Sequence, residues 1–94
     1  MPRYKQKGDA IRKAFNDKLK NNPHIVNIRH LGLMIGIELD QPCGELVTRA
    51  LEAGLLINVT QEKVIRLLPP LIIDATQINQ LVDTLSALIQ ELTA

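Results

Sequence analysis

Apolar residues recur at helical spacing near both ends of the chain. Residues 8–20 carry them at Ile11, Ala14, Phe15 and Leu19, with charged residues between. This spacing predicts an amphipathic helix. Asp9 is expected at its N-cap or in its first turn. Asn21-Asn22-Pro23 should end it, because a residue that precedes proline avoids the helical conformation.

The C-terminal stripe is longer and has no gap. Its members are Ile78, Leu81, Val82, Leu85, Leu88, Ile89 and Leu92. Asp74 and Gln77 are spaced as a capping pair at the start of this helix. Residues 43–53 predict a further helix, with Gly54 as the residue just past its end. Its expected apolar stripe is Leu46, Val47, Ala50 and Leu51.

Between the helices, short runs predict strands. Residues 33–39 alternate, with Leu33, Ile35, Ile37 and Leu39 on one face. Together with residues 25–29 they predict a hairpin that bends or bulges at Gly32. Gly36 suggests that another group passes close to the backbone there. Residues 55–59 and 64–68 predict two more strands, joined by a polar turn at 60–63.

The predicted order is α-β-β-α-β-β-α. It indicates an α+β fold in which helices pack on a small, mainly antiparallel sheet. The 94 residues show no repeat, linker or low-complexity stretch, so residues 1–94 are expected to form a single domain.

Composition narrows the possible partners. Leu, Ile, Val and Phe make up about a third of the chain, which is typical of a globular protein. The net charge of +1 and the scarcity of aromatic residues argue against nucleic acid and anionic membranes as partners. A single cysteine and an N-terminus without an apolar segment indicate a cytoplasmic protein with no signal peptide.

Arg66 is the one candidate site residue. It lies in VIRLLPPLII, residues 64–73, where an unpaired charge would be costly to desolvate. One interpretation is structural: the side chain extends to solvent or pairs with a carboxylate of its own domain. The other is that it faces a cleft and holds a ligand carboxylate through a bidentate contact. Pro69 and Pro70 favour the second by stiffening the chain beyond it.

The other reactive side chains predict no site. Cys43 lies near a predicted helix N-terminus, where a thiol can be activated, but no base is linked to it, so a passive cysteine is expected. His24 and His30 lack metal-site spacing. The N-terminal basic residues are interrupted by Asp9 and Asp17 and predict a solvated helix face. They are Arg3, Lys5, Lys7, Arg12, Lys13, Lys18 and Lys20.

Three segments carry a family resemblance. IRHLGLMIGIEL (28–39), ALEAGLLIN (50–58) and VIRLLPPLII (64–73), in this order, resemble the C-terminal small domain of class III aminotransferases. These are pyridoxal-phosphate enzymes, and the likeness is to the acetylornithine type. The resemblance implies a large cofactor-binding domain outside this chain, a homodimer, and amino-group transfer between N-acetylornithine and 2-oxoglutarate in arginine biosynthesis.

The resemblance also assigns residues. The family arginine that binds the substrate carboxylate falls on Arg66. The catalytic lysine and the phosphate-binding residues belong to the large domain, so the isolated chain is expected to be inactive and to bind no pyridoxal phosphate. His30 stands where the family has a glycine, and no role is carried to it. A stand-alone amino-acid-binding or regulatory module, or a remnant that acts by association, remain the alternatives.

Overall fold

The computed structural model describes residues 3–32, 34–68 and 74–93, with side chains from Gly8 onward. The elements are α1 (Arg3–Leu19), β1 (Ile25–Leu31), β2 (Met34–Leu39), α2 (Leu46–Glu52), β3 (Asn58–Thr60), β4 (Val64–Leu67) and α3 (Ala75–Leu92). Their order is the predicted one. The strands form one sheet in the order β1-β2-β4-β3, and every neighbouring pair is antiparallel. The α+β prediction is therefore confirmed.

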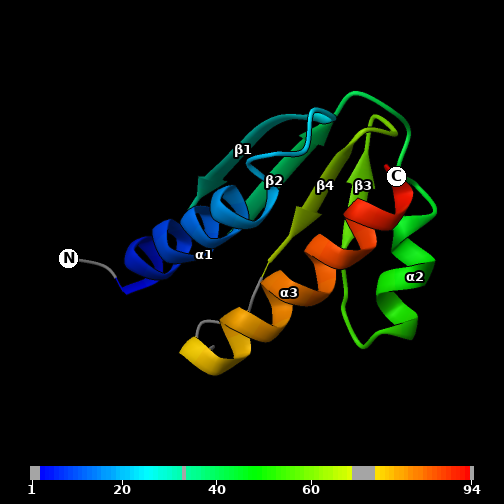
Figure 1. Ribbon diagram of the computed structural model, residues 1–94. Coiled ribbons are helices and arrows are strands. Elements are labelled where there is room, and N and C mark those ends of the chain that lie inside the picture. Colours follow the sequence, from blue (N-terminus) through cyan, green and yellow to red (C-terminus); the bar gives the residue numbers. More distant parts are fainter. Residues whose placement is uncertain (1–2, 33, 69–73, 94) are drawn as a thin grey trace.

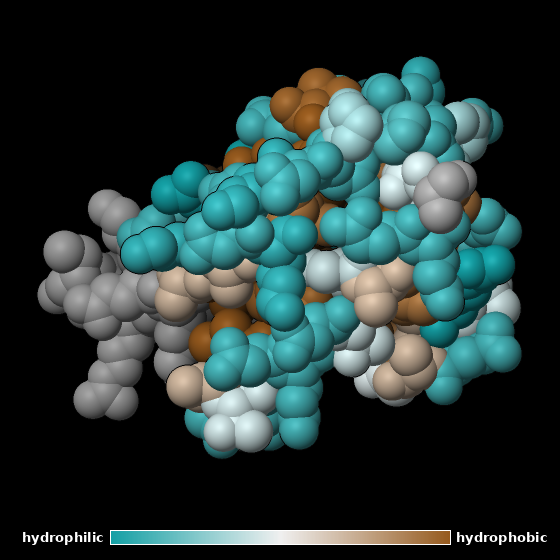
Figure 2. Space-filling view, viewed as in Figure 1, coloured by the Kyte–Doolittle hydropathy of each residue, from teal (hydrophilic) through white to brown (hydrophobic). Residues whose placement is uncertain are grey.

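The molecule has two layers (Figure 1). Helices α1 and α3 cover one face of the sheet, and α2 packs beside α3. Figure 2 shows that the surface on this side is mainly hydrophilic, with small hydrophobic areas across its middle and one at its upper edge. The opposite face of the sheet, which we call the open face, is covered by none of the described helices.

The core lies between the helices and the covered face. From the sheet, Ile35, Ile37 and Ile65 are fully buried, because alternation sends every second side chain to the same side. From the helices come Ile11, Phe15, Leu19, Val82, Leu85 and Ile89. Burial of each such side chain stabilises the fold by about 1.5–3 kcal/mol. The predicted alternation of β2 is confirmed for 35, 37 and 39, while Leu33 lies outside the described residues.

Local signals place the ends of two helices as predicted. At α3, the Asp74 carboxylate accepts a hydrogen bond from the Gln77 backbone N–H, and the Gln77 side chain accepts one from the Asp74 N–H, at 2.8 and 3.0 Å. After α2, Gly54 has a φ of 88°. The N–H of Leu55 bonds to the carbonyl of Ala50 and that of Gly54 to Leu51, which together make a Schellman motif.

Other boundaries were predicted wrongly. Helix α1 begins at Arg3, so Asp9 lies within the helix and is not its N-cap. Residues 3–7 are mainly good helix formers but carry no apolar period to reveal it. Helix α2 begins at Leu46, after a turn that starts at Gly44. The third strand covers only Asn58–Thr60.

The expected apolar stripe of α2 is also half wrong. Leu46 and Ala50 are buried, but Val47 and Leu51 are 36% and 60% exposed. This helix has only seven residues and contacts α3 along a narrow line. One narrow contact buries one residue per turn, so the second row of apolar residues stays in solvent.

The turn between β3 and β4 is strained at two residues. Gln61 and Glu62 have φ values of 53° and 66°, and the Lys63 N–H bonds to the Thr60 carbonyl at 3.2 Å. This is a type I′ hairpin turn, which favours Asn-Gly at its two central positions. The polar turn was predicted, but its left-handed conformation was not.

Substitution in this turn should raise stability. We expect Gln61→Asn with Glu62→Gly to increase the free energy of unfolding by about 1 kcal/mol, because both new residues tolerate a positive φ. Gly54→Ala is the matched control, and we expect it to decrease the free energy of unfolding. A Cβ at Gly54 would meet nothing within 4 Å, so its cost, also about 1 kcal/mol, comes from the backbone alone. Urea midpoints measure both, and equal signs for the two variants would contradict this reading.

Candidate functional site

Arg66 lies on the open face, in the middle of the sheet. Strand alternation buries its neighbours Ile65 and Leu67 on the covered face and leaves Arg66 exposed. Gly36 of β2 is its partner on one side and Asn58 of β3 on the other. Arg29 of β1 is paired with Gly36 in turn. One row across the sheet therefore reads Arg29, Gly36, Arg66, Asn58.

A hollow of about 300 Å³ lies beside Arg66. Its other lining residues are Met34, Leu56, Ile57, Asn58, Leu67 and Leu68. Among the described residues, no carboxylate lies within ion-pair distance of Arg66, which contradicts internal pairing as an explanation for this charge. The guanidinium is exposed at a hollow with apolar walls, and its role there stays a prediction. Pro69 and Pro70 lie outside the described residues.

Arg29 is a site neighbour that the sequence analysis did not single out. A Cβ at Gly36 would lie 3.7 Å from its Cγ and 3.8 Å from its Nε, so the Arg29 side chain lies over the glycine. These are ordinary van der Waals distances that leave room for a Cβ, so the described residues do not show the close approach predicted at Gly36. The guanidinium is 3.6 Å from the Glu38 carboxylate. Arg29 is thus already paired, whereas Arg66 is open to an external anion.

Exposed apolar side chains line the Arg66 hollow at Leu56, Leu68 and Met34, and the exposed Leu31 is the strand partner of Met34. Leu56 and Leu68 are 84% and 72% exposed, and Met34 and Leu31 are exposed where β1 turns into β2. We call these four residues the open-face patch. Isolated exposed leucines are common on protein surfaces, but a cluster beside an unpaired charge is typical of a surface that meets a partner.

A larger hollow, of about 620 Å³, lies between residues 53–56, the end of β4 and α3. Its walls are apolar apart from Gln77, Gln80 and Thr84. None of its lining side chains is charged, so it offers no group that would recognise an anion or transfer a proton. Chemistry therefore favours the smaller hollow beside Arg66 as the candidate site.

Cys43 is fully buried in the core. Desolvation raises the pKa of its thiol above the ordinary value of 9.0. The residue precedes α2 by three positions, and burial, not a helix dipole, controls the thiol. An activated cysteine is excluded on these grounds, and the passive cysteine that was predicted is what the structure describes.

This burial makes stability depend on alkaline pH. The folded thiol holds its proton more tightly than the unfolded one, so its contribution is complete below about pH 9 and is lost as the pH rises further. We expect the stability difference between the wild-type chain and Cys43→Ala to shrink between pH 8 and pH 10.5. Urea denaturation of both proteins measures it, and a difference that does not change with pH would contradict the assignment.

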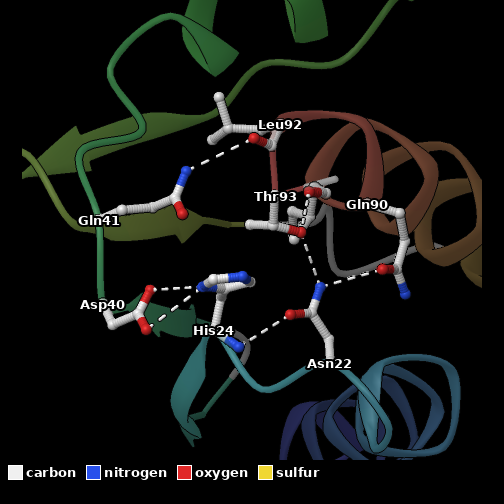
Figure 3. A network of polar contacts seen from close by, with 8 residues as sticks. Asn22, His24, Asp40, Gln41, Gln90, Leu92 and Thr93 are labelled. Carbon is white, nitrogen blue, oxygen red and sulfur yellow. Dashed lines mark hydrogen bonds and ion pairs between the residues drawn. The ribbon is translucent and has the colours of Figure 1, made fainter.

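His24 belongs to a polar network beside the C-terminal end of α3 (Figure 3). Its Nδ1 lies 3.0 and 3.3 Å from the Asp40 carboxylate oxygens. Asn22, at the end of α1, donates to Gln90 and Thr93 at the end of α3 and accepts from the His24 backbone N–H. The network joins both helix ends to the hairpin. These hydrogen bonds are typical of a network that stabilises the fold.

Other polar groups add no site. Of the described residues, no three His, Cys, Asp or Glu side chains gather as they would around a metal ion. Lys18 is paired with Asp83 at 2.9 Å and Arg12 lies 3.9 Å from Asp9, which fits the predicted solvated helix face. The side chains of Arg3, Lys5 and Lys7 are outside the described part. Nor is any described helix both long and apolar enough to cross a bilayer.

The chain is similar in sequence to known enzymes. The chain is 51% identical over 87 residues to acetylornithine aminotransferase 1 of Bordetella pertussis and 45% identical over 82 residues to acetylornithine aminotransferase of Nitrosomonas europaea. These matches cover 93% and 87% of the chain but only 22% and 21% of the relatives. The chain thus spans about a fifth of the length of these enzymes.

Solved structures agree with the fold. Ornithine delta-aminotransferase of Plasmodium falciparum superposes with a TM-score of 0.87 over 97% of the chain and 24% of its own, at 20% identity. Acetylornithine aminotransferase of Elizabethkingia anophelis does so with a TM-score of 0.78 over 95% of the chain and 24% of its own, at 28% identity. The family model for class-III aminotransferases matches residues 1–89. With nearly its whole length matched, the chain belongs to the class III aminotransferase family.

Proposed function

We propose that this chain is the C-terminal small domain of an acetylornithine-type aminotransferase, the rest of which lies outside residues 1–94. The parent enzyme would transfer an amino group between N-acetylornithine and 2-oxoglutarate in arginine biosynthesis. The relatives' names and the share of their length that the chain covers support this proposal. The observation that carries the chain's own part in it is the unpaired Arg66 at the open face.

In this proposal Arg66 binds the carboxylate of the amino-acid substrate. A planar guanidinium can donate two parallel N–H bonds to a carboxylate, which fixes its orientation as well as its position. Neighbouring strands hold the Arg66 backbone on both sides, at Gly36 of β2 and Asn58 of β3. Arg29 forms an ion pair with Glu38, whereas Arg66 has no carboxylate partner among the described residues. A substrate carboxylate can therefore bind Arg66 without breaking an ion pair within the chain.

The open-face patch would meet the large domain. Leu56 and Leu68 are mostly exposed in the separate chain, and covering them would remove apolar surface from water. They stand around Arg66, so a domain that covers them would close the hollow over the guanidinium. Water exclusion strengthens a charge-assisted hydrogen bond at such a junction. In the parent enzyme we expect this assembly to be part of a homodimer.

Pyridoxal phosphate, which the family implies, does not fit the residues described here. When bound, it supplies the electron sink of amino transfer, and an enzyme must hold it with a lysine and a phosphate cradle. The lysines with described side chains, Lys13, Lys18, Lys20 and Lys63, are all exposed, and none lines the Arg66 hollow. The proposal therefore assigns the cofactor to the rest of the enzyme and no catalytic step to this chain alone.

A chimera tests the proposal. This chain replaces the matching fifth of the Bordetella pertussis relative, and amino transfer from N-acetylornithine to 2-oxoglutarate is measured. We expect the chimera to be active and the separate chain to be inactive, even with added pyridoxal phosphate. A folded, cofactor-loaded chimera without this activity would overturn the substrate assignment.

The alternatives give different results. Saturable binding of N-acetylornithine, glutamate or 2-oxoglutarate by the separate chain, lost in Arg66→Ala, would support a stand-alone amino-acid-binding or regulatory module. Self-association through the open-face patch without ligand binding, abolished by Leu56→Gln with Leu68→Gln, would support a remnant that acts by association.

A further inference from the structure

His30 lies on the covered side of β1, between α1 and the β1–β2 turn. Its Nε2 is 2.7 Å from the Asp9 carboxylate and its Nδ1 is 3.2 Å from the carbonyl oxygen of Gly32. Only 14% of the side chain is exposed. The imidazole, 21 residues from Asp9 along the chain, therefore joins helix α1 to the β1–β2 turn.

Both partners of this ring are hydrogen-bond acceptors. A neutral imidazole carries one N–H, so it can donate to the carboxylate or to the carbonyl but not to both. In the neutral form one ring nitrogen would turn its lone pair towards an oxygen lone pair. The imidazolium carries two N–H groups and donates to both partners. The geometry is thus complete only when His30 is protonated.

Two glycines allow the backbone to approach closely beside the imidazole ring. A Cβ at Gly8 would collide with the carbonyl oxygen of Gly32 and would lie 2.8 Å from Nδ1 of His30. Helix α1 therefore approaches the turn at a residue that has no side chain. Gly32 has a φ of 61°, a conformation that glycine adopts without strain. The contact of His30 with Gly32 therefore requires glycine at position 8, and glycine suits the backbone at position 32.

We propose that His30 is a protonation-dependent clamp that fastens α1 to the β1–β2 turn. The clamp has both hydrogen bonds when the ring carries two N–H groups, and it loses one of them when the ring gives up a proton. Among the side chains that the structure describes, the charged groups at the contact are Asp9 and, through Asp9, Arg12, whose guanidinium is 3.9 Å from the same oxygen. β2 contributes the apolar Ile35, the strand partner of His30.

The clamp acts on the hairpin end that borders the Arg66 hollow. Leu31 and Met34 flank the turn, and Met34 lines the hollow. Opening the clamp would therefore loosen one wall of the hollow without touching Arg66. This inference does not depend on the proposed function, since it concerns only contacts within the chain.

Amide hydrogen exchange tests the clamp on the chain itself. After correction for the intrinsic pH dependence of exchange, we expect protection of the amides around the turn to fall about fivefold between pH 5.5 and pH 7.5, as for the loss of one hydrogen bond. His30→Gln should abolish this pH dependence. His24→Gln, which removes the other histidine at its pair with Asp40, should retain it.

A second measurement needs no variant. The ¹⁵N shifts of the His30 ring show whether one or both nitrogens carry a proton, and protection should fall in step with the loss of the second proton. Protection that does not follow the protonation of the ring, protection that is equal at the two pH values, or pH dependence that survives in His30→Gln would each overturn the proposal.

Discussion

Replacing Phe15 by alanine should lower the free energy of unfolding by about 3–5 kcal/mol. Phe15 is the only phenylalanine, is fully buried on the inner side of α1, and is the largest fully buried side chain described. A cavity at this position would remove contacts with the rest of the core, and few other side chains here are large enough to move into it. A domain of this length has about 5–14 kcal/mol of stability in total, so one substitution should bring it close to unfolding at 25 °C.

Asn16→Ala is the matched control. Asn16 is next to Phe15 in the same helix but exposed, so its substitution should change stability by less than about 0.5 kcal/mol. Urea denaturation of both variants measures the difference. A loss below 1 kcal/mol for Phe15→Ala would mean that α1 does not pack on the sheet as described.

Replacing Arg66 by glutamine should reduce kcat/KM for N-acetylornithine roughly a hundredfold in the chimera proposed above. Two charge-assisted hydrogen bonds to a carboxylate contribute about 3 kcal/mol together, and each 1.4 kcal/mol is a factor of ten. Arg66→Lys should recover only part of the loss, because an ammonium cannot make the bidentate contact. Steady-state kinetics with both substrates give the measurement.

The chain offers a control for this substitution. Arg49 is an exposed arginine on α2, paired with Glu91 at 3.5 Å and remote from the open-face row. Arg49→Gln should leave kcat/KM within about twofold, since surface ion pairs of this kind contribute less than 1 kcal/mol. If the Arg49 and Arg66 variants behaved alike, the carboxylate assignment would be wrong.

Features that depend on neighbours in sequence were predictable. The α3 stripe, the Asp74–Gln77 capping box and the Gly54 helix end all rest on residues within a few positions of one another. The alternation in β2 identified the buried face before any partner strand was known. The same alternation in β4, which the structure shows, puts Arg66 opposite to Ile65 and Leu67, on the face that the described helices leave open.

Features that depend on tertiary packing were not predictable. The early start of α1 has no apolar period, and the exposure of Val47 and Leu51 depends on how little of α2 the third helix covers. The Asp9–His30 contact joins residues 21 apart, and the Asn22–Thr93 contact joins residues 71 apart. Arg29 beside Arg66 became visible only through the strand register, with Gly36 between them.

The strand order β1-β2-β4-β3 has a consequence for how the chain acquires its fold. Each hairpin closes a loop of a few residues, but the β2–β4 seam pairs Ile35 with Leu67. During synthesis, β2 can pair with β1 early, but its other edge stays unpaired until α2 and the second hairpin have emerged. Short loops close before long ones, so the hairpins form first and their joining is the slow step. Arg66 and Gly36 face each other across this seam, and the candidate site comes into existence only with that last joining.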